Sequence, residues 1–138
     1  MPESSKLDTM LPHAAPVCGN ARTLLFAIRR MAIHGLNDAF AANAMLAAYG
    51  MRYRKPLLLV RALLIDIARS ARGHVIVAPC CAPRMTAHEH ALLSAIGDPA
   101  GADTHIARLL DSGKTSTAVA TATALNESLS AIGRPVAL

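Results

Sequence analysis

Aromatic residues and long apolar runs are both scarce in this chain of 138 residues. It has no Trp, two Phe and two Tyr, although 53% of its residues are hydrophobic. The core must therefore be built from Leu, Ile, Ala, Val and Met. That palette suits closely packed helices better than a β-sandwich, which favours aromatic and β-branched residues. No apolar run reaches the ~18 residues of a membrane-spanning helix, because charges interrupt even the longest candidate, PLLLVRALLIDIA.

Cysteine is also too sparse for a disulfide framework. There are three cysteines, and Cys18 is far in sequence from the adjacent pair Cys80 and Cys81. Small secreted scaffolds use larger, even sets. The N-terminus, MPESSKLD, lacks the apolar stretch of a secretion signal. We therefore expect a cytoplasmic protein that is not bound to a membrane and whose cysteines are thiols.

The spacing of the hydrophobic residues predicts an all-α fold. Residues 1–19 have no periodicity and are expected to form a flexible tail, followed by a single helical domain over 20–138. Helices are expected over about 21–34, 37–50, 56–72, 86–96, 99–113 and 115–132. The segment HVIVAP, residues 74–79, is expected to be extended and buried. The prediction is a compact bundle of five or six helices with this short extended segment before the Cys-Cys loop.

The first expected helix is apolar on more than one side. Phe26 and Ile33 fall away from its main hydrophobic stripe, among arginines. A helix of this kind is covered by the core on one side and by an interface on the other. This pattern predicts a homodimer.

Acidic residues are scarce in one half of the chain. Residues 20–84 carry ten Lys/Arg and two acids, whereas the other residues carry four Lys/Arg and seven acids. The excess favours an acidic protein partner or nucleic acid, and Tyr53 is a candidate for stacking on a base. Nucleic acid is not favoured, because no helix-turn-helix with a polar reading helix is evident. The alternative is a solvated face with salt bridges to the acidic half. The candidate basic-surface residues are Arg22, Arg29, Arg30, Arg52, Tyr53, Arg54, Lys55, Arg61, Arg69 and Arg72.

The most unusual stretch is VAPCCAPRMTAHEH, residues 77–90. A disulfide between Cys80 and Cys81 would be strained and easily reduced, because the Cα atoms of adjacent residues are only ~3.8 Å apart. Arg84 and the N-terminus of the helix that follows both favour the thiolate form of a nearby cysteine. Two thiolates suit a redox signal or a thiophilic metal ion such as zinc or copper. The candidate metal or redox residues are Cys80, Cys81, His74, His88 and His90, although their spacing matches no familiar zinc pattern.

Three functions remain open on these residues. The preferred one is a non-catalytic regulatory or adaptor protein that binds a protein partner and is tuned at the Cys-Cys loop. The alternatives are a basic, nucleic-acid-binding transcriptional regulator and a thiol-dependent enzyme, whose base would be His88 or His34 with Asp38 orienting His34. No catalytic residue is assigned. The simplest alternative is that both cysteines have no functional role and are small, buried apolar residues.

Three stretches resemble a small bacterial family of unknown function. They are RTLLFAIRRMAIHGLNDAFAANAMLAAYG, YRKPLLLVRALL and VAPCCAPRMTAHE, and they cover much of residues 22–97. The distinctive part is the motif A-P-C-C-x-P-R-M-T. The resemblance implies that relatives often carry three consecutive cysteines, whereas this chain has Ala82 in the third place. It implies no activity.

Overall fold

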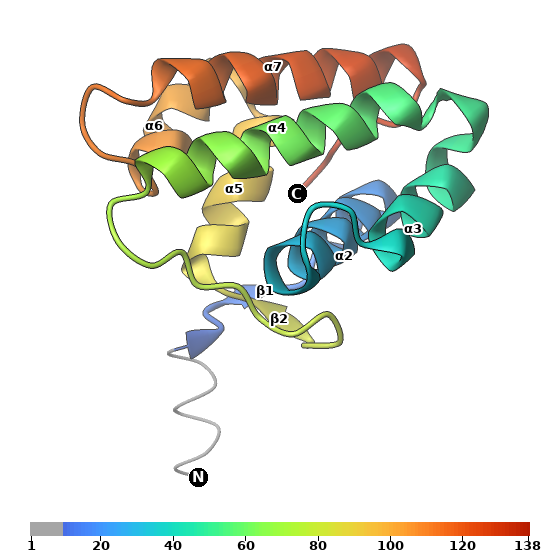
Figure 1. Cartoon of the computed structure of the whole chain (residues 1–138), viewed down its shortest axis with the longest axis horizontal. Helices are drawn as coiled ribbons and strands as arrows, with labels where there is room; N and C mark the ends of the chain where they lie inside the picture. Colours follow the sequence, from blue (N-terminus) through green and yellow to red (C-terminus); the bar gives the residue numbers. More distant parts are fainter. Residues whose placement is uncertain (1–9) are drawn as a thin grey trace, which may run out of the picture.

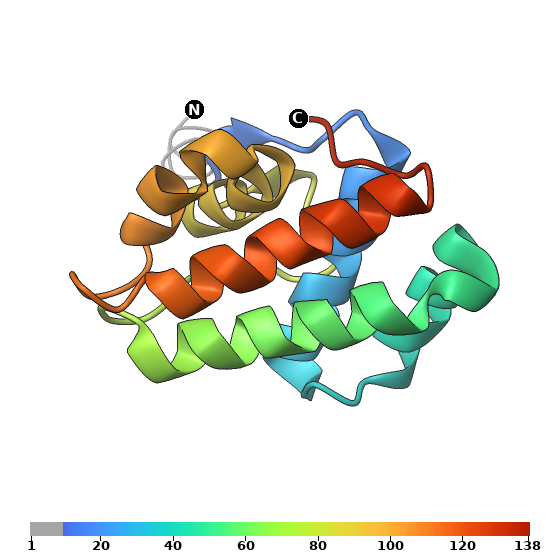
Figure 2. The same cartoon turned by 90° about the horizontal axis from the view of Figure 1, so that it is seen from above.

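Two long helices, α4 (Arg54–Ser70) and α7 (Ser116–Ala131), lie side by side and form one layer of the molecule. The other helices lie beneath them, and α2 (Gly19–His34) crosses under both (Figures 1 and 2). The computed structural model describes residues 10–138. This described part contains six α-helices, so the prediction of an all-α bundle of five or six helices is confirmed. None of these helices is long and apolar enough to cross a membrane.

Apolar stripes at helical spacing hold the two layers together. In α4 the buried stripe includes Leu57, Val60, Leu63 and Ile67, which recur three or four residues apart and so share one face. The stripe of α7 consists largely of small residues and ends in Leu125 and Leu129, both 0% exposed. Small side chains allow the two helix axes to approach closely. Packing therefore holds α7 helical despite its many Ser and Thr residues.

A sharp turn at Gly35 joins α2 to α3 (Ala39–Tyr49). The side chain of Asp38 accepts a hydrogen bond from the backbone N–H of Ala41, 3.0 Å away, and so caps α3. A 3₁₀ turn, η1 (Gly50–Arg52), then leads into α4. Asn20 lies in the first turn of α2, and the N-cap position of that helix is taken by Cys18. The amide of Asn20 pairs with Tyr49 and with the carbonyl of Arg134.

The helix expected over 99–113 is much shorter in the structure. After α5 (Ala87–Gly97), a 3₁₀ turn, η2 (Pro99–Gly101), leads into the six-residue helix α6 (Ala102–Ala107). The chain beyond α6 leaves the helix to bond the end of α4. The N–H of Asp111 donates to the carbonyl of Ser70, and the N–H of Arg72 donates to the carbonyl of Leu109, both at 3.0 Å. These long-range backbone bonds explain why the expected helix stops early.

A two-stranded antiparallel sheet, which the sequence did not indicate, joins the N-terminal segment to the cysteine loop. Strand β1 (His13–Ala14) pairs with β2 (Arg84–Met85), with His13 opposite Met85. The sequence predicts a flexible tail over residues 1–19. Residues 1–9 lie outside the described part of the chain, and residues 10–19 contain β1. Residues 74–79 form neither helix nor strand, and the expectation that they are buried is wrong: only Ala78 is buried, and Ile76 is 57% exposed.

Candidate functional site

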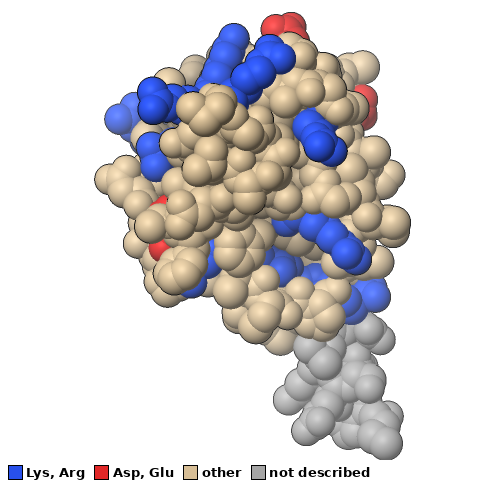
Figure 3. Space-filling model, turned by 90° about the vertical axis from the view of Figure 1, so that its right-hand side faces the viewer, with Lys and Arg blue, Asp and Glu red and all other residues tan. Residues whose placement is uncertain are grey.

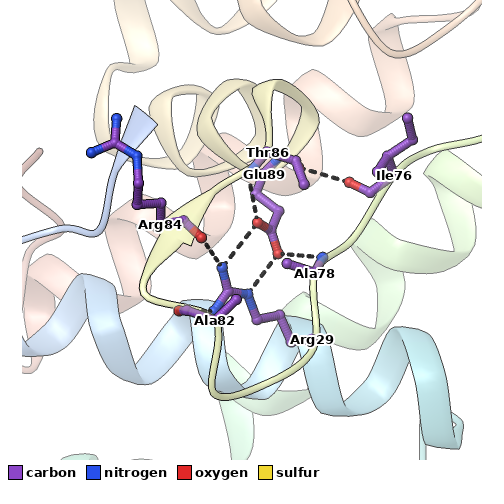
Figure 4. Close-up of polar contacts among 7 residues, drawn as sticks. All are labelled: Arg29, Ile76, Ala78, Ala82, Arg84, Thr86 and Glu89. Carbon is purple, nitrogen blue, oxygen red and sulfur yellow. Dashed lines mark hydrogen bonds and ion pairs between the residues drawn. The ribbon is translucent and has the colours of Figure 1, made fainter. Parts of the chain in front are cut away.

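A buried ion pair between Arg29 of α2 and Glu89 of α5 lies beneath the cysteine loop (Figure 4). The two residues are 2% exposed. Arg29 Nε lies 2.7 Å from Glu89 Oε2, and Nη2 lies 3.1 Å from Oε1. Paired contacts of this kind between guanidinium and carboxylate are among the stronger hydrogen bonds in proteins. The pair fixes α5 to α2 at the base of the loop.

The same two side chains also hold both ends of the loop (Figure 4). Arg29 donates to the carbonyls of Ala82 and Arg84, at 3.1 and 2.8 Å. Glu89 accepts from the N–H of Ala78 at 3.2 Å and from the N–H of Thr86 at 2.8 Å. One buried acid and one buried base therefore clamp residues 78–86 in place.

Thr86 completes the clamp. Its hydroxyl accepts from the N–H of Glu89, while the Glu89 carboxylate accepts from the N–H of Thr86, and these reciprocal bonds form a capping box. The same hydroxyl donates to the carbonyl of Ile76 at 2.7 Å. The extended segment before the cysteines is thus bonded to the first turn of α5.

The two cysteines form the tip of the clamped loop. The N–H of Ala82 donates to the carbonyl of Pro79 at 3.0 Å, so Cys80 and Cys81 are the central residues of a tight turn. Cys81 is exposed and Cys80 is half-buried, and both are free thiols. The interpretation of both as buried, apolar core residues is therefore wrong. Solvent reaches the thiols.

The cation whose pKa is affected by a thiol is Arg30, whereas Arg84 bonds the N-terminal segment. Arg30 makes a paired contact with Asp38, at 2.9 and 3.1 Å, and its guanidinium lies 4.7 Å from the centre of the Phe40 ring. Asp38 raises the pKa of Arg30 above its ordinary value, and the adjacent Cys80 thiol adds to this effect. Arg30 in turn lowers the pKa of Asp38. Arg30 thus connects the thiol to the residue that caps α3.

Arg84, predicted as the thiol-activating residue, holds the N-terminal segment instead. Its Nε donates to the carbonyl of Leu11 at 2.9 Å and its Nη2 to that of Pro12 at 3.1 Å. Its side chain points away from the loop (Figure 4). Arg84 lies in strand β2, where successive side chains point to opposite faces. The sequence alone did not show whether the Arg84 side chain points toward the thiols or away from them.

The three histidines named as metal or redox candidates do not form one cluster: His74 and His88 line the same hollow, whereas His90 packs elsewhere. His88 Nδ1 accepts a hydrogen bond from the N–H of Ile76 at 2.8 Å. His90 stacks on His13 with ring centres 3.8 Å apart, and burial lowers its pKa. His74 is exposed in the extended segment. Within residues 10–138, no three His, Cys, Asp or Glu side chains are arranged to hold a metal ion.

Most residues of the expected basic surface are exposed, but Arg29 is not. Arg29 is buried with Glu89, and Tyr53 packs partly against the core. Lys and Arg side chains gather on the face in Figure 3, where few Asp or Glu appear. In the described part of the chain, the only Lys/Arg–acid pairs are those of Arg29 and Arg30. The exposed cations of this surface are Arg22, Arg52, Arg54, Lys55, Arg69 and Arg72, and Arg61 is half-buried with its Nε on the carbonyl of Leu36.

Sequence reasoning missed the Arg29–Glu89 clamp and the Arg30–Asp38–Phe40 contact. One signal was available for the first: Arg29 follows the apolar Leu25 by four positions on its helix, so the two share a face, and Leu25 is buried. The spacing of Thr86 and Glu89 is that of a capping box, which gives Glu89 a local role and no indication of a second partner. No sequence signal pairs either residue with the other across 60 positions.

Comparison with known protein families shows to which family the chain belongs. A family of unknown function, DUF6628, matches residues 2–135. The chain belongs to this family. The match covers nearly the whole chain, so the resemblance to a family of unknown function is confirmed. Neither the curated proteins nor the solved structures contain a match to this chain.

Proposed function

We propose that the protein is a small, non-catalytic regulatory or adaptor protein that binds a protein partner and is tuned by its two adjacent thiols. One observation carries this proposal: Arg30 pairs with Asp38, which caps α3, and lies near enough to the Cys80 thiol for that thiol to help raise the pKa of Arg30. A chemical change at Cys80 therefore acts on the residue that positions the start of α3.

The surface beside the thiols has the composition of a binding site for protein. Phe40 is 64% exposed and lies against Arg30, and Ile33 near the end of α2 is 53% exposed. Aromatic and arginine side chains are enriched at protein interfaces. The uncompensated cations elsewhere on the molecule favour a partner with an acidic surface.

The tuning step is oxidation by a peroxide. The Cys80 thiolate attacks one peroxide oxygen, the O–O bond breaks, and the products are a sulfenic acid and water once protons are taken up. The Cys81 thiol then displaces that oxygen as a second water and forms a strained disulfide with Cys80. Either product removes the thiol from Arg30, so Arg30 and the start of α3 rearrange.

A thiophilic metal is the other candidate signal. Zinc favours four ligands, and within the described residues no three His, Cys, Asp or Glu side chains are arranged to hold an ion. Copper(I), a soft ion, fits a two-thiolate site better than zinc does. Native mass spectrometry before and after mild oxidation distinguishes the two signals: a mass gain of one metal ion that Cys81→Ser abolishes indicates metal, and loss of two hydrogens indicates a disulfide.

The partner-binding part is tested by cross-linking in cells. A photoreactive phenylalanine analogue replaces Phe40 in one variant and the exposed Glu127 of α7 in a control. We expect a specific adduct with an acidic protein from position 40 only, and we expect peroxide to reduce it in the parent protein but not in the Cys80→Ser, Cys81→Ser variant. Equal adducts from both positions, or no effect of peroxide, would contradict the proposal.

A homodimer and a cytoplasmic location belong to the same proposal. The exposed Ile33 supports a second apolar contact on α2, outside the core. Light scattering of the purified protein measures the mass in solution, and Ile33→Glu is expected to give a monomer if α2 forms the contact. The free thiols support a reducing compartment. A fluorescent fusion would test this location.

A further inference from the structure

An apolar hollow of about 390 Å³ lies next to the clamp that holds the cysteine loop. Its walls come from α2, α4 and the start of α5, and the extended segment from Gly73 to Val77 borders it. Most of the lining side chains are aliphatic, among them Met31, Leu36 and Leu64. A well-packed core leaves few voids larger than a water molecule, so a hollow of this size indicates room for a ligand.

The polar groups of this hollow are few and are oriented. Glu89 is engaged by Arg29. His88 accepts the N–H of Ile76 at Nδ1, so its neutral ring carries the proton on Nε2, where it is a donor for a ligand. His74 also lines the hollow. Ligand sites typically combine an apolar wall with a small number of such groups.

A smaller hollow of about 120 Å³ adjoins the first, because both are lined by Gly73, His74, Val75 and His88. Its other lining residues are Arg72, Arg108 and Leu109. None of its lining residues is acidic. The smaller hollow therefore offers two permanent positive charges to the head of any ligand whose apolar part fills the larger one.

We propose that the two hollows together bind a medium-chain aliphatic carboxylate. The chain lies in the apolar hollow, and the carboxylate accepts hydrogen bonds from His88 Nε2–H and lies near Arg72 and Arg108. The volume of the larger hollow fits such a ligand. At ~30 Å³ for each group of the size of a water molecule, it holds roughly a dozen carbon or oxygen groups. This inference is independent of the proposed role of the thiols.

Decanoate, kept below its critical micelle concentration, is the probe. Calorimetry and the methyl NMR signals of Val75 and Val77 report its binding. We expect decanoate to bind at least tenfold more tightly than hexanoate, because each buried methylene contributes up to about fourfold. We also expect it to bind more tightly than decanol or decylammonium, which lack the negative head.

Matched variants locate the site. Ala68→Trp, at an exposed position that lines the apolar hollow, is expected to abolish binding, and Ala32→Trp on the opposite wall is a second plug if the first fails to fold. Arg108→Gln is expected to weaken binding about fivefold, whereas Arg69→Gln, outside both hollows, leaves it unchanged. No saturable binding of decanoate, equal binding of decanol or decylammonium, or unchanged binding to a folded Trp variant would overturn the proposal.

Discussion

Replacing Glu89 by Gln removes the negative charge from the clamp while keeping the size of the side chain. In the parent protein this carboxylate accepts two hydrogen bonds from Arg29 and one each from the N–H groups of Ala78 and Thr86. In Glu89→Gln the Arg29 guanidinium stays buried with no acid beside it. An amide also cannot accept all four bonds, because one of its two polar atoms is a donor.

The loss of unfolding free energy expected for Glu89→Gln is large compared with the stability of a domain of this size. Removing one partner of a buried ion pair costs about 3–5 kcal/mol, and domains are typically stable by about 5–15 kcal/mol. Replacing both partners, as in Arg29→Met with Glu89→Leu, removes the stranded charge. We expect the loss of unfolding free energy in this double variant to be smaller than the sum of the losses in Arg29→Met and in Glu89→Leu. The double variant has no unpaired buried charge, whereas each single variant has one.

Urea unfolding followed by circular dichroism at 222 nm measures these differences, since the chain has no Trp to report by fluorescence. Hydrogen exchange at Ala78 and Thr86 reports the loop itself. We expect both amides to exchange faster in Glu89→Gln than in the parent protein. A loss below about 1 kcal/mol, with unchanged exchange at these two amides, would refute the idea that the buried pair holds the loop.

Three further changes test the fold around the site. Thr86→Ala removes the capping side chain and its bond to Ile76, and urea unfolding is expected to show a loss of about 1–2 kcal/mol. Leu125→Ala opens a cavity where α7 packs on the core, and the same assay is expected to show a loss of about 2–5 kcal/mol. Burial lowers the pKa of His90 below its ordinary value of 6.5, so the unfolded chain takes up the proton first, and stability is full above about pH 6.5 and falls as the pH drops further. Thermal unfolding between pH 7.5 and 5 should show this fall in the parent protein and a smaller one in His90→Phe.

The helices could be predicted because their signals are local. The stripes of α4 and α7 and the Thr86–Glu89 capping box depend on residues three or four positions apart, and the spacing alone shows that they share a face. The same reasoning failed at residues 108–113. There the competing partners are the backbone groups of Ser70 and Arg72, about 40 positions earlier, which no local pattern reveals.

The candidate site could be located but not assembled from the sequence. The unusual stretch around Cys80 and Cys81 drew attention to the loop that Arg29 and Glu89 hold, but the contacts that hold it could not be predicted. Which cation lies near the thiol depends on how α2 crosses α5 and on the side-chain directions in β2. Arg29 and Arg30 are neighbours in sequence, yet one is buried in the clamp and the other contacts Cys80. Tertiary packing decides between such neighbours.

The coupling between Cys80 and the start of α3 is tested most directly by backbone NMR during titration with hydrogen peroxide. In the parent protein we expect the amide signals of Phe40 and Ala41 to shift in step with those of Cys80 and Cys81, because Arg30 changes partner as the thiol is lost. In Arg30→Gln only the loop signals should move. Shifts confined to residues 79–82 in the parent protein would contradict the proposed role of the thiols.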